Sequence, residues 1–408
     1  MVWDTVDEYP CCAAPPLSWS PMFSQRTDWK LTPNHFTRAV EEVRQSGREI
    51  LDLTVSNPTR VGIVYDGPAI LDSLRNPKSL DYDPQAKGLL SAREAVAAYY
   101  ADRGEHIDPE QLVLTTSTSE GYSYIFRLLA NPGDEVLVPK PSYPLFDFLA
   151  ELQDVKLVGY PLLYDHGWQI DWSSLESAVT EKTRAVVVVH PNNPTGSYAS
   201  AGEPERLSKL CRDRGLAMIV DEVFLDYAHD GSRRSSFVAN DGALTFTLSG
   251  MSKISALPQM KLAWIAVSGP RSDTEAAVRR LEVVADTYLS LNAPVQLAAD
   301  VFLEQRKKIQ PQLMQRVREN LAELDHQLVG QKSSERLDVE GGWYAVVRVP
   351  VMQSDEELAI ALLRNAGTMV HPGHFYDFPR DGYLVTSLIT PENDFREGIS
   401  RLLGFLGQ

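Results

Sequence analysis

The chain has 408 residues, of which 43% are hydrophobic and 23% are charged, a composition that excludes a disordered chain and is typical of a globular protein with a sizeable core. Its 55 acidic residues outnumber its 39 basic ones and give a net charge of −16, which argues against nucleic acid or an anionic membrane as a partner. No apolar run approaches the ~18 residues that a membrane-spanning helix needs.

The cysteines indicate neither a disulfide framework nor a metal site. Cys11 and Cys12 are adjacent, and Cys211 stands alone in a helical pattern. The stretch 1–20 lacks the basic start and apolar core of a signal peptide. We therefore expect no bound metal and a cytoplasmic protein in a reducing compartment, with residues 1–33 as an N-terminal arm.

The predicted elements begin with a helix over 34–46, a short strand over 50–55 and a turn at Ser56-Asn57-Pro58-Thr59. A long alternation of helices and apolar strands follows. The helices are expected at 89–102, 119–130, 145–152 and 205–213, and the strands at 112–114, 135–138, 185–189, 217–220, 244–248 and 262–267. Apolar strands separated by helices indicate an α/β domain, with a mostly parallel sheet between two layers of helices.

The order of elements changes beyond residue 295. A long amphipathic helix is expected over 295–327, with a kink at Pro311. It is followed by predicted strands at 344–349 and 383–388 and predicted helices at 355–365 and 392–403. This change predicts a second, smaller α+β domain formed by 34–66 and 295–408, which leaves 67–294 as the large domain.

Lys253 comes three residues after an apolar strand that ends in the small residues Ser249-Gly250. A lysine is a poor nucleophile at its free pKa of about 10.4, but it becomes a good one where a partly dry pocket disfavours the ammonium form. Lys253 is therefore a candidate nucleophile toward a carbonyl cofactor. Taken by itself, a lysine after a strand is more often a surface residue.

Polar residues also follow two other strands, and ligands collect at the carboxyl ends of parallel strands. After the strand 185–189, Pro194 and Gly196 fix a turn that holds the Asn193 amide outward, where it would bind a ligand oxygen or only complete a polar turn.

Asp221 follows the strand 217–220. Its ordinary role would be to cap a helix. Its functional role would be to hold a proton on a ring nitrogen, because a carboxylate–cation pair at ~4 Å is worth about 4 kcal/mol at an effective dielectric of ~20.

The strand 112–114 passes into a helix through the hydroxyl-rich run Thr115 to Ser119. The start of a helix is a ready anion site. The backbone amides and hydroxyls of Ser117, Thr118 and Ser119 could therefore cradle a phosphate, and simple capping of the helix by Ser119 is the alternative.

In this order and at these spacings, the four stretches resemble the fold-type I pyridoxal-phosphate enzymes, and among them the class I/II aminotransferases, over roughly 50–403. The resemblance is carried by Asn193-Pro194-Thr195-Gly196, Asp221-Glu222-Val223-Phe224, and Ser252-Lys253 with Lys261 further on. Residues 139–144 resemble the family's segment with an aromatic residue that stacks on the cofactor ring. Leu80-Asp81-Tyr82 resembles the segment that lends a tyrosine to the partner subunit.

The resemblance implies a homodimeric aminotransferase that moves an amino group between an amino donor and a 2-oxo acid, with pyridoxal 5′-phosphate bound as an aldimine to Lys253. Lys253 would then act as general base and acid. Asp221 would keep the ring nitrogen protonated, Asn193 would hydrogen-bond the ring O3′, and Tyr143 would stack on the ring. The phosphate would be held by Ser117, Thr118, Ser119, Ser252, Lys261 and, from the second copy of the chain, Tyr82.

Three positions near the cofactor depart from the family pattern. Lys261 stands where arginine usually holds the phosphate, so the charge is kept but the bidentate fork is lost. Gly250 stands where a phosphate-binding serine is common. Phe224 stands where a tyrosine often donates to O3′.

Two further departures concern the substrate. Ser56-Asn57-Pro58 replaces the usual glycine turn of the small domain, and Val385 occupies the position of the arginine that normally clamps the substrate carboxylate. We therefore expect an amino donor of atypical carboxylate placement, bound near Asn57 with Arg60 or His374 as the replacement anchor.

Two alternatives remain open from the sequence. One is a pyridoxal-phosphate lyase or decarboxylase on the same scaffold. The other is a non-catalytic, cofactor-binding regulator, which would be expected to carry a DNA-binding helix-turn-helix segment or to lack the lysine.

Overall fold

An eight-stranded sheet forms the centre of the fold in the computed structural model, which describes residues 22–144 and 146–407. The strand order is β2-β9-β8-β7-β6-β3-β4-β5. Strands β3, β4, β6, β7 and β8 run parallel, whereas β9 is antiparallel to both of its neighbours and β5 is antiparallel to β4. The bounds are β2 Leu112–Thr115, β3 Glu135–Lys140, β4 Lys156–Tyr164, β5 Trp168–Ile170, β6 Thr183–Val189, β7 Ala217–Asp221, β8 Thr245–Gly250 and β9 Ala263–Ser268.

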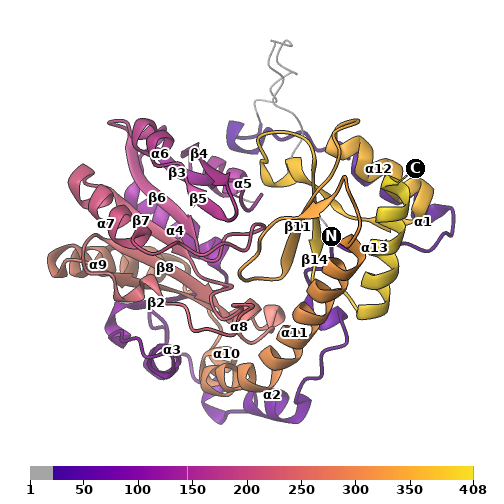
Figure 1. Ribbon diagram of the computed structural model, residues 1–408. Coiled ribbons are helices and arrows are strands. Elements are labelled where there is room, and N and C mark those ends of the chain that lie inside the picture. The colour runs from indigo at the N-terminus through magenta and orange to yellow at the C-terminus, as the bar shows by residue number, and fades with distance from the viewer. Residues whose placement is uncertain (1–21, 145, 408) are drawn as a thin grey trace.

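Helices cover both faces of this sheet (Figure 1). One face packs against α4 (Thr118–Leu129), α5 (Phe146–Glu151) and α9 (Arg271–Tyr288), and the other against α3 (Leu90–Asp102), α6 (Trp172–Ala178) and α7 (Glu203–Arg214). Successive side chains of a strand point to opposite faces, so Val187 meets the first layer and Val188 the second. This arrangement explains why the strands are apolar throughout, and it confirms the predicted three-layer α/β/α fold with a mostly parallel sheet.

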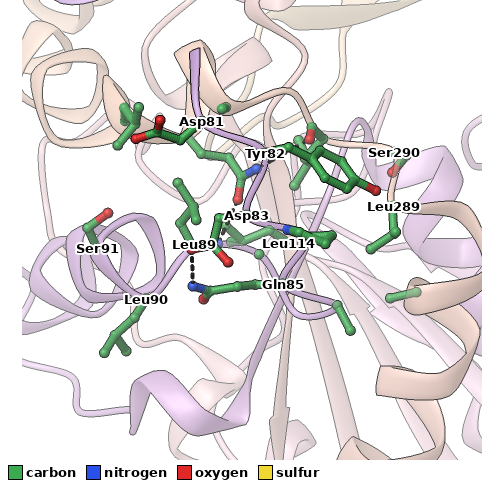
Figure 2. A pocket seen from close by; sticks show the side chains of 18 of the residues that line it. Asp81, Tyr82, Asp83, Gln85, Leu89, Leu90, Ser91, Leu114, Leu289 and Ser290 are labelled. Atoms are coloured by element: carbon green, nitrogen blue, oxygen red, sulfur yellow. Dashed lines mark hydrogen bonds between the residues drawn. The ribbon is translucent and has the colours of Figure 1, made fainter. Parts of the chain in front are cut away.

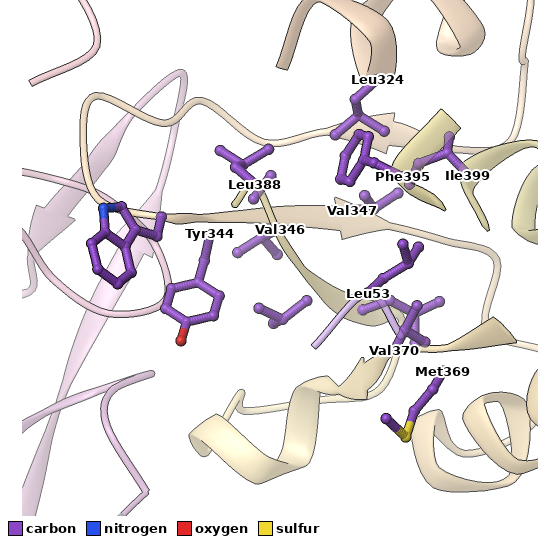
Figure 3. Close-up of a cluster of buried hydrophobic side chains, with 14 of the residues drawn as sticks. Leu53, Leu324, Tyr344, Val346, Val347, Met369, Val370, Leu388, Phe395 and Ile399 are labelled. Carbon is purple, nitrogen blue, oxygen red and sulfur yellow. The ribbon is translucent and has the colours of Figure 1, made fainter. Parts of the chain in front are cut away.

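A smaller antiparallel sheet is built from the C-terminal part of the chain, in the order β10-β11-β14-β13. Its strands are β10 Glu335–Arg336, β11 Tyr344–Arg348, β13 His371–Pro372 and β14 Tyr383–Ser387, and its helices are α12 Asp355–Ala366 and α13 Glu392–Leu406. Helix α1 (His35–Gln45) packs against α12, and β1 (Leu51–Asp52) pairs in parallel with β12 (Thr368–Met369). Figure 3 shows Leu53 among side chains of this C-terminal part, including Val346 and Phe395.

Two helices connect the large sheet to the smaller one, α10 (Ala293–Leu297) and α11 (Ala299–Leu328). Phe302, near the start of α11, packs in the same cluster as α3, whereas Leu313 and Val317 pack with the smaller sheet. The single helix predicted over 295–327 is thus interrupted at Ala298, and Pro311 lies inside a continuous α11. The domain boundaries at 66/67 and 294/295 stay a prediction.

The structure differs from the predicted elements in three main ways. The strand expected over 50–55 is only two residues long, because Asp52 Oδ1 accepts hydrogen bonds from Thr54 and turns the chain. The strand β4 was not predicted, since Gly159 and Pro161 are rare inside strands. The helix α9 was also missed, although Ala277, Val278, Leu281 and Ala285 form a buried helical stripe.

Residues 1–21 of the predicted N-terminal arm, which include Cys11 and Cys12, lie outside the described residues. Further along, the Trp29 indole N–H donates to Glu151 at 2.6 Å and its ring meets Phe148 edge-on, so this segment lies on α5. No helix within 22–144 and 146–407 is both long and apolar enough to cross a membrane. A cytoplasmic location stays a prediction.

Candidate active site

The carboxyl ends of β2, β3, β6, β7 and β8 meet at one edge of the large sheet, where a cavity of about 280 Å³ opens. Ligands of parallel sheets bind at such edges. The cavity is lined by nine of the predicted site residues: Ser117, Thr118, Ser119, Tyr143, Asn193, Asp221, Ser252, Lys253 and Lys261.

Lys253 lies on the short helix α8 (Met251–Ile254) that follows β8. Its Nζ is 4.8 Å from the centroid of the Trp343 ring and 5.3 Å from that of Phe224. Burial lowers the pKa of Lys253 to about 8, and the negative charge of Asp221 acts against this shift. The lysine side chain therefore lies in the partly dry environment that the nucleophile hypothesis requires.

Gly250 is the last residue of β8 and packs directly on β9. A Cβ at this position would lie 2.8 Å from the Cβ of Ala263 and 3.0 Å from its Cα, closer than real contacts allow. The phosphate-binding serine that is common here in the family does not fit without moving β9. The departure at Gly250 is therefore explained by packing.

Asp221 is the last residue of β7 and is 7% exposed. Its carboxylate accepts hydrogen bonds from the hydroxyl of Tyr122 at 3.2 Å and from the backbone N–H of Val223 at 3.1 Å. Burial raises the pKa of Asp221 to about 6, and both hydrogen bonds lower it. Asp221 caps no helix, because a turn follows it. Sequence reasoning missed Tyr122, whose position on α4 is 99 residues away from its partner.

Asn192 and Asn193 are adjacent but differ in their hydrogen bonding. The Asn192 side chain is bonded to Ser142, to the carbonyl of Pro141 and to Thr195, so it holds the turn together. The Asn193 Oδ1 is buried and has no partner among the described residues. Asn192 therefore completes the polar turn, whereas the Asn193 side chain still has a polar atom, Oδ1, that can bond to a ligand.

The start of α4 lines the same cavity. Ser117 is the capping residue, and its Oγ accepts the backbone N–H of Glu120 at 3.2 Å, so the predicted capping by Ser119 is wrong. The N–H groups of the first turn of a helix have no partner within the helix and carry its positive dipole end. Ser252 and Lys261 line the same cavity and add a hydroxyl and a positive charge.

Tyr143 follows β3 and meets Phe146 edge-on at 5.9 Å. Burial raises the pKa of its hydroxyl, which stays protonated at neutral pH. The backbone N–H of the preceding residue, Ser142, donates to the carbonyl of Tyr376 at 2.9 Å. An aromatic ring is thereby held at the cavity wall by a contact with the C-terminal part of the chain.

Four predicted residues do not line this cavity. Tyr82 is 85% exposed and lines a separate cavity of about 470 Å³, where Figure 2 shows it with Leu289 and Ser290. Asn57 caps the short turn Pro58–Arg60, and Arg60 is exposed at its end. His374 lies in the turn Gly373–Tyr376, with its ring against Phe375.

The wall beside Lys253 contains residues that sequence reasoning did not single out. Ser56, Val223, Leu257 and Tyr344 line the cavity. Val385 is fully buried in β14 between Val346 and His371 of the neighbouring strands. Among the described residues, the charged side chains that line the cavity are Asp221, Lys253 and Lys261, and none is an arginine.

Comparisons with known proteins agree with this geometry. The family described as Aminotransferase class I and II matches residues 68–401. The glutamate-pyruvate aminotransferase AlaA of Haemophilus influenzae is 27% identical over 375 residues, which cover 89% of this chain and 92% of AlaA. The S-alkyl-thiohydroximate lyase SUR1 of Arabidopsis thaliana is 31% identical over 245 residues, 59% of this chain and 53% of the lyase.

Among solved structures, the alanine aminotransferase of Pyrococcus furiosus superimposes with a TM-score of 0.83 at 22% identity, covering 91% of this chain and 95% of that one. This likeness shows the shared fold. The family match spans most of the chain and contains every residue that lines the cavity except Ser56. The chain therefore belongs to the class I and II aminotransferases, enzymes that transfer an amino group from a donor to an acceptor.

Proposed function

We propose that the cavity beside Lys253 binds pyridoxal 5′-phosphate and that the protein uses it to move an amino group between an amino donor and a 2-oxo acid. The observation that carries this proposal is the convergence on one cavity of Lys253, Asp221 and Asn193, whose Oδ1 has no partner among the described residues, together with the start of α4. Their chemistry fits a cofactor with an aldehyde, a basic ring nitrogen, a phenolic oxygen and a phosphate.

The cofactor's phosphate would be held at the start of α4 by Ser117, Thr118 and Ser119, with Ser252 and Lys261. The backbone amides, the helix dipole and the lysine all favour an anion at this end of the cavity. Tyr143 would cover the ring. Tyr82 would reach the phosphate of a second copy of the chain, because it is exposed in this copy.

When bound, the cofactor supplies the electron sink that acidifies the carbon next to the transferred nitrogen. Lys253 would bind it covalently through Nζ and afterwards carry the proton to and from that carbon. With a pKa of about 8, roughly a tenth of Lys253 is neutral at pH 7, whereas an ordinary lysine is neutral in well under one molecule per thousand. Burial thus raises the supply of the reactive form several hundredfold.

Asp221 would hold a proton on the ring nitrogen. Burial raises its pKa to about 6, and a protonated ring nitrogen beside it would favour the ionised carboxylate. Tyr122 and the Val223 N–H keep both oxygens oriented. Asn193 would bind the phenolic oxygen through its amide.

The substrate is expected to be atypical in its carboxylate placement, because no arginine in the described part of the chain lines the cavity. A bidentate arginine–carboxylate pair contributes about 1.5–3 kcal/mol and also fixes orientation. Arg60 and His374 remain the proposed replacement anchors. If common α-amino acids are good donors and neither Arg60→Ala nor His374→Ala weakens them by as much as tenfold, about 1.4 kcal/mol, the replacement-anchor proposal is wrong.

A lyase or decarboxylase on the same scaffold is the second candidate, and the similarity to the lyase SUR1 favours keeping it. The two reactions differ in their products. A single turnover with a panel of amino acids and amines leaves the aminated cofactor if the reaction is transamination, and releases carbon dioxide or an eliminated group if it is not.

The cofactor assignment is tested by reducing the purified protein with borohydride and mapping the labelled peptide by mass spectrometry. We expect the cofactor on Lys253, and turnover of Lys253→Ala reduced by a thousandfold or more, about 4 kcal/mol. Lys261→Met is the matched control, because it removes a cavity amine yet should leave the label on Lys253. A label on any other lysine overturns the assignment.

A further inference from the structure

The backbone around Lys253 is held by side chains from other elements. The hydroxyl of Tyr227 donates to the carbonyl of Lys253 at 2.7 Å. The side-chain amide of Gln310, from α11, donates to the carbonyl of Ile254 at 2.8 Å, and the hydroxyl of Tyr65 donates to the carbonyl of Ala256 at 2.9 Å. The four-residue helix α8 is too short to stabilise itself, so these bonds determine where the lysine side chain begins.

The lysine side chain ends in an aromatic box formed by Phe224 and Trp343. The Nζ lies 4.8 Å from the Trp343 centroid and 5.3 Å from that of Phe224, and the two rings meet edge-on at 5.1 Å. Trp343 also meets Tyr227 edge-on at 5.1 Å. The same tyrosine therefore holds the lysine backbone and supports the ring that covers the amine.

Trp343 does not hold itself in place by a polar contact. It is completely buried, and its indole N–H has no acceptor among the described residues. Its position depends on the segment Glu340–Trp343, which precedes β11 of the smaller sheet.

This segment is bonded to two turns of the large sheet. Glu340 N–H donates to the carbonyl of Gly196 at 3.3 Å, in the turn that follows Asn193. Gly342 N–H donates to the carbonyl of Tyr227 at 2.9 Å, and His229 N–H donates to the carbonyl of Glu340 at 2.8 Å, both in the turn that follows Asp221. The strand ends that carry Asn193 and Asp221 thus also place Trp343.

The fit at Gly341 is tight. A Cβ there would lie 2.7 Å from the hydroxyl oxygen of Tyr198 and 2.8 Å from the carbonyl oxygen of Tyr227. Only glycine allows the segment to approach both turns this closely. Any side chain at this position has to displace the segment that carries Trp343.

We propose that Trp343 is a positioning residue for Lys253: it closes the aromatic box with Phe224, keeps water from the amine, and so makes the reactivity of the lysine depend on the segment Glu340–Trp343. This inference rests on the proposed function of Lys253. The charged groups that share the cavity with the amine are Asp221 and Lys261, and the titratable ones are Tyr143 and Tyr344. None of these residues is replaced in the variants below, so a change in the pKa of Lys253 measures the effect of the aromatic box.

The test measures the pH dependence of acylation of Lys253 in the full-length protein after removal of its cofactor. The labelled peptides are quantified by mass spectrometry, with the exposed Lys332 as internal reference. The midpoint of the acylation-against-pH curve reports the pKa of Lys253. In Trp343→Ala water reaches the amine and stabilises the ammonium form, so this midpoint should rise from about 8 by one pH unit or more. At pH 8 this shift corresponds to acylation slowed at least about fivefold.

Removing the indole ring also has a smaller effect that lowers the pKa of Lys253, because an aromatic ring stabilises the ammonium cation above it. Trp343→Phe keeps a ring and should therefore shift the midpoint by less than about half a pH unit. A midpoint in Trp343→Ala that is unchanged or lower overturns the proposal.

Gly341→Ala keeps every side chain of the box and moves only the segment, so it decides the question if Trp343→Ala does not fold. The midpoint should rise in this variant too, and an unchanged midpoint overturns the proposal. Because acylation is measured without the cofactor, its outcome is separate from that of the borohydride experiment. A cofactor label on another lysine would refute the proposed function while leaving the measured effect of Trp343 in place.

Discussion

The two sides of the end of β7 differ in how completely their polar groups are bonded. On the cavity side, the Asn193 Oδ1 has no partner, and the Lys253 Nζ makes no hydrogen bond within the described part of the chain. On the interior side, the Glu222 carboxylate accepts the hydroxyl of Ser236 at 2.6 Å and the N–H of Phe237 at 2.7 Å. Two carboxylates adjacent in sequence, Asp221 and Glu222, thus face different environments.

The interior side also contains a buried ion pair between Arg103 and Asp226. The hydroxyl of Tyr99 and the amide of Gln310 donate to the same carboxylate. Every carboxylate oxygen of this cluster has a donor, whereas the cavity keeps polar atoms without one. A buried polar atom that lacks a partner and faces a cavity can be satisfied by a ligand, whereas carboxylates bonded inside the protein contribute to the fold, although the Arg103 Nε has no partner among the described residues. The cavity variants should therefore alter catalysis and the interior variants should alter stability.

The largest effect is expected for Asp221→Asn. The asparagine Oδ1 can still accept the Val223 N–H, and its NH₂ group can donate to the hydroxyl oxygen of Tyr122, but the negative charge opposite the ring nitrogen is lost. A pair worth about 4 kcal/mol corresponds to a loss of roughly a thousandfold in turnover. Steady-state kinetics and urea unfolding should show this loss with a free energy of unfolding no lower than that of the parent. Near-normal turnover would mean that Asp221 does not act on the cofactor.

Asp226→Asn should have the opposite profile. It leaves the buried Arg103 guanidinium without its counter-charge, which costs about 3 kcal/mol or more of the free energy of unfolding. Turnover per folded, cofactor-loaded molecule should stay within a few fold of the parent. A stable variant with strongly reduced turnover would show that the interior cluster takes part in catalysis.

Glu222→Gln should change how stability depends on pH. Burial raises the pKa of Glu222 to about 8, above an unfolded value of about 4.5. The protonated form therefore stabilises the folded state most at low pH, and this contribution is lost as pH rises from about 5 to 8. Glutamine removes the dependence, so the difference in unfolding free energy between variant and parent should grow in favour of the variant over this range. Parallel pH profiles would contradict a protonated Glu222.

The smallest effect is expected for Phe224→Tyr, which adds a hydroxyl to the aromatic box. A donor to the cofactor's phenolic oxygen contributes about 1 kcal/mol, or roughly 0.7 pH unit. The absorption of the bound cofactor should therefore change at a higher pH in the parent than in the variant. Spectrophotometric titration of both proteins measures this difference, and an equal or lower value in the parent refutes it.

The fold and the proposed cofactor-binding end of the cavity could be predicted from local patterns. Apolar strands with polar residues at their carboxyl ends placed Lys253, Asp221, Asn193 and the hydroxyl run at one edge of a sheet, and the structure brings them to one cavity. This reasoning succeeds because parallel strands have a fixed direction, so the residue after each strand lies at the same edge. The family pattern added Tyr143 and Lys261, which also line the cavity.

The substrate end was decided by tertiary packing. Arg60 and His374 were predicted from their place in motifs, and both lie in short turns that do not line the cavity. Tyr122 and Trp343 carry no sequence signal, since their partners Asp221 and Lys253 lie 99 and 90 positions away along the chain. Local sequence determines which residue ends a strand. Only the packing of the two sheets and their helices determines which aromatic side chain, distant in sequence, lies against that residue.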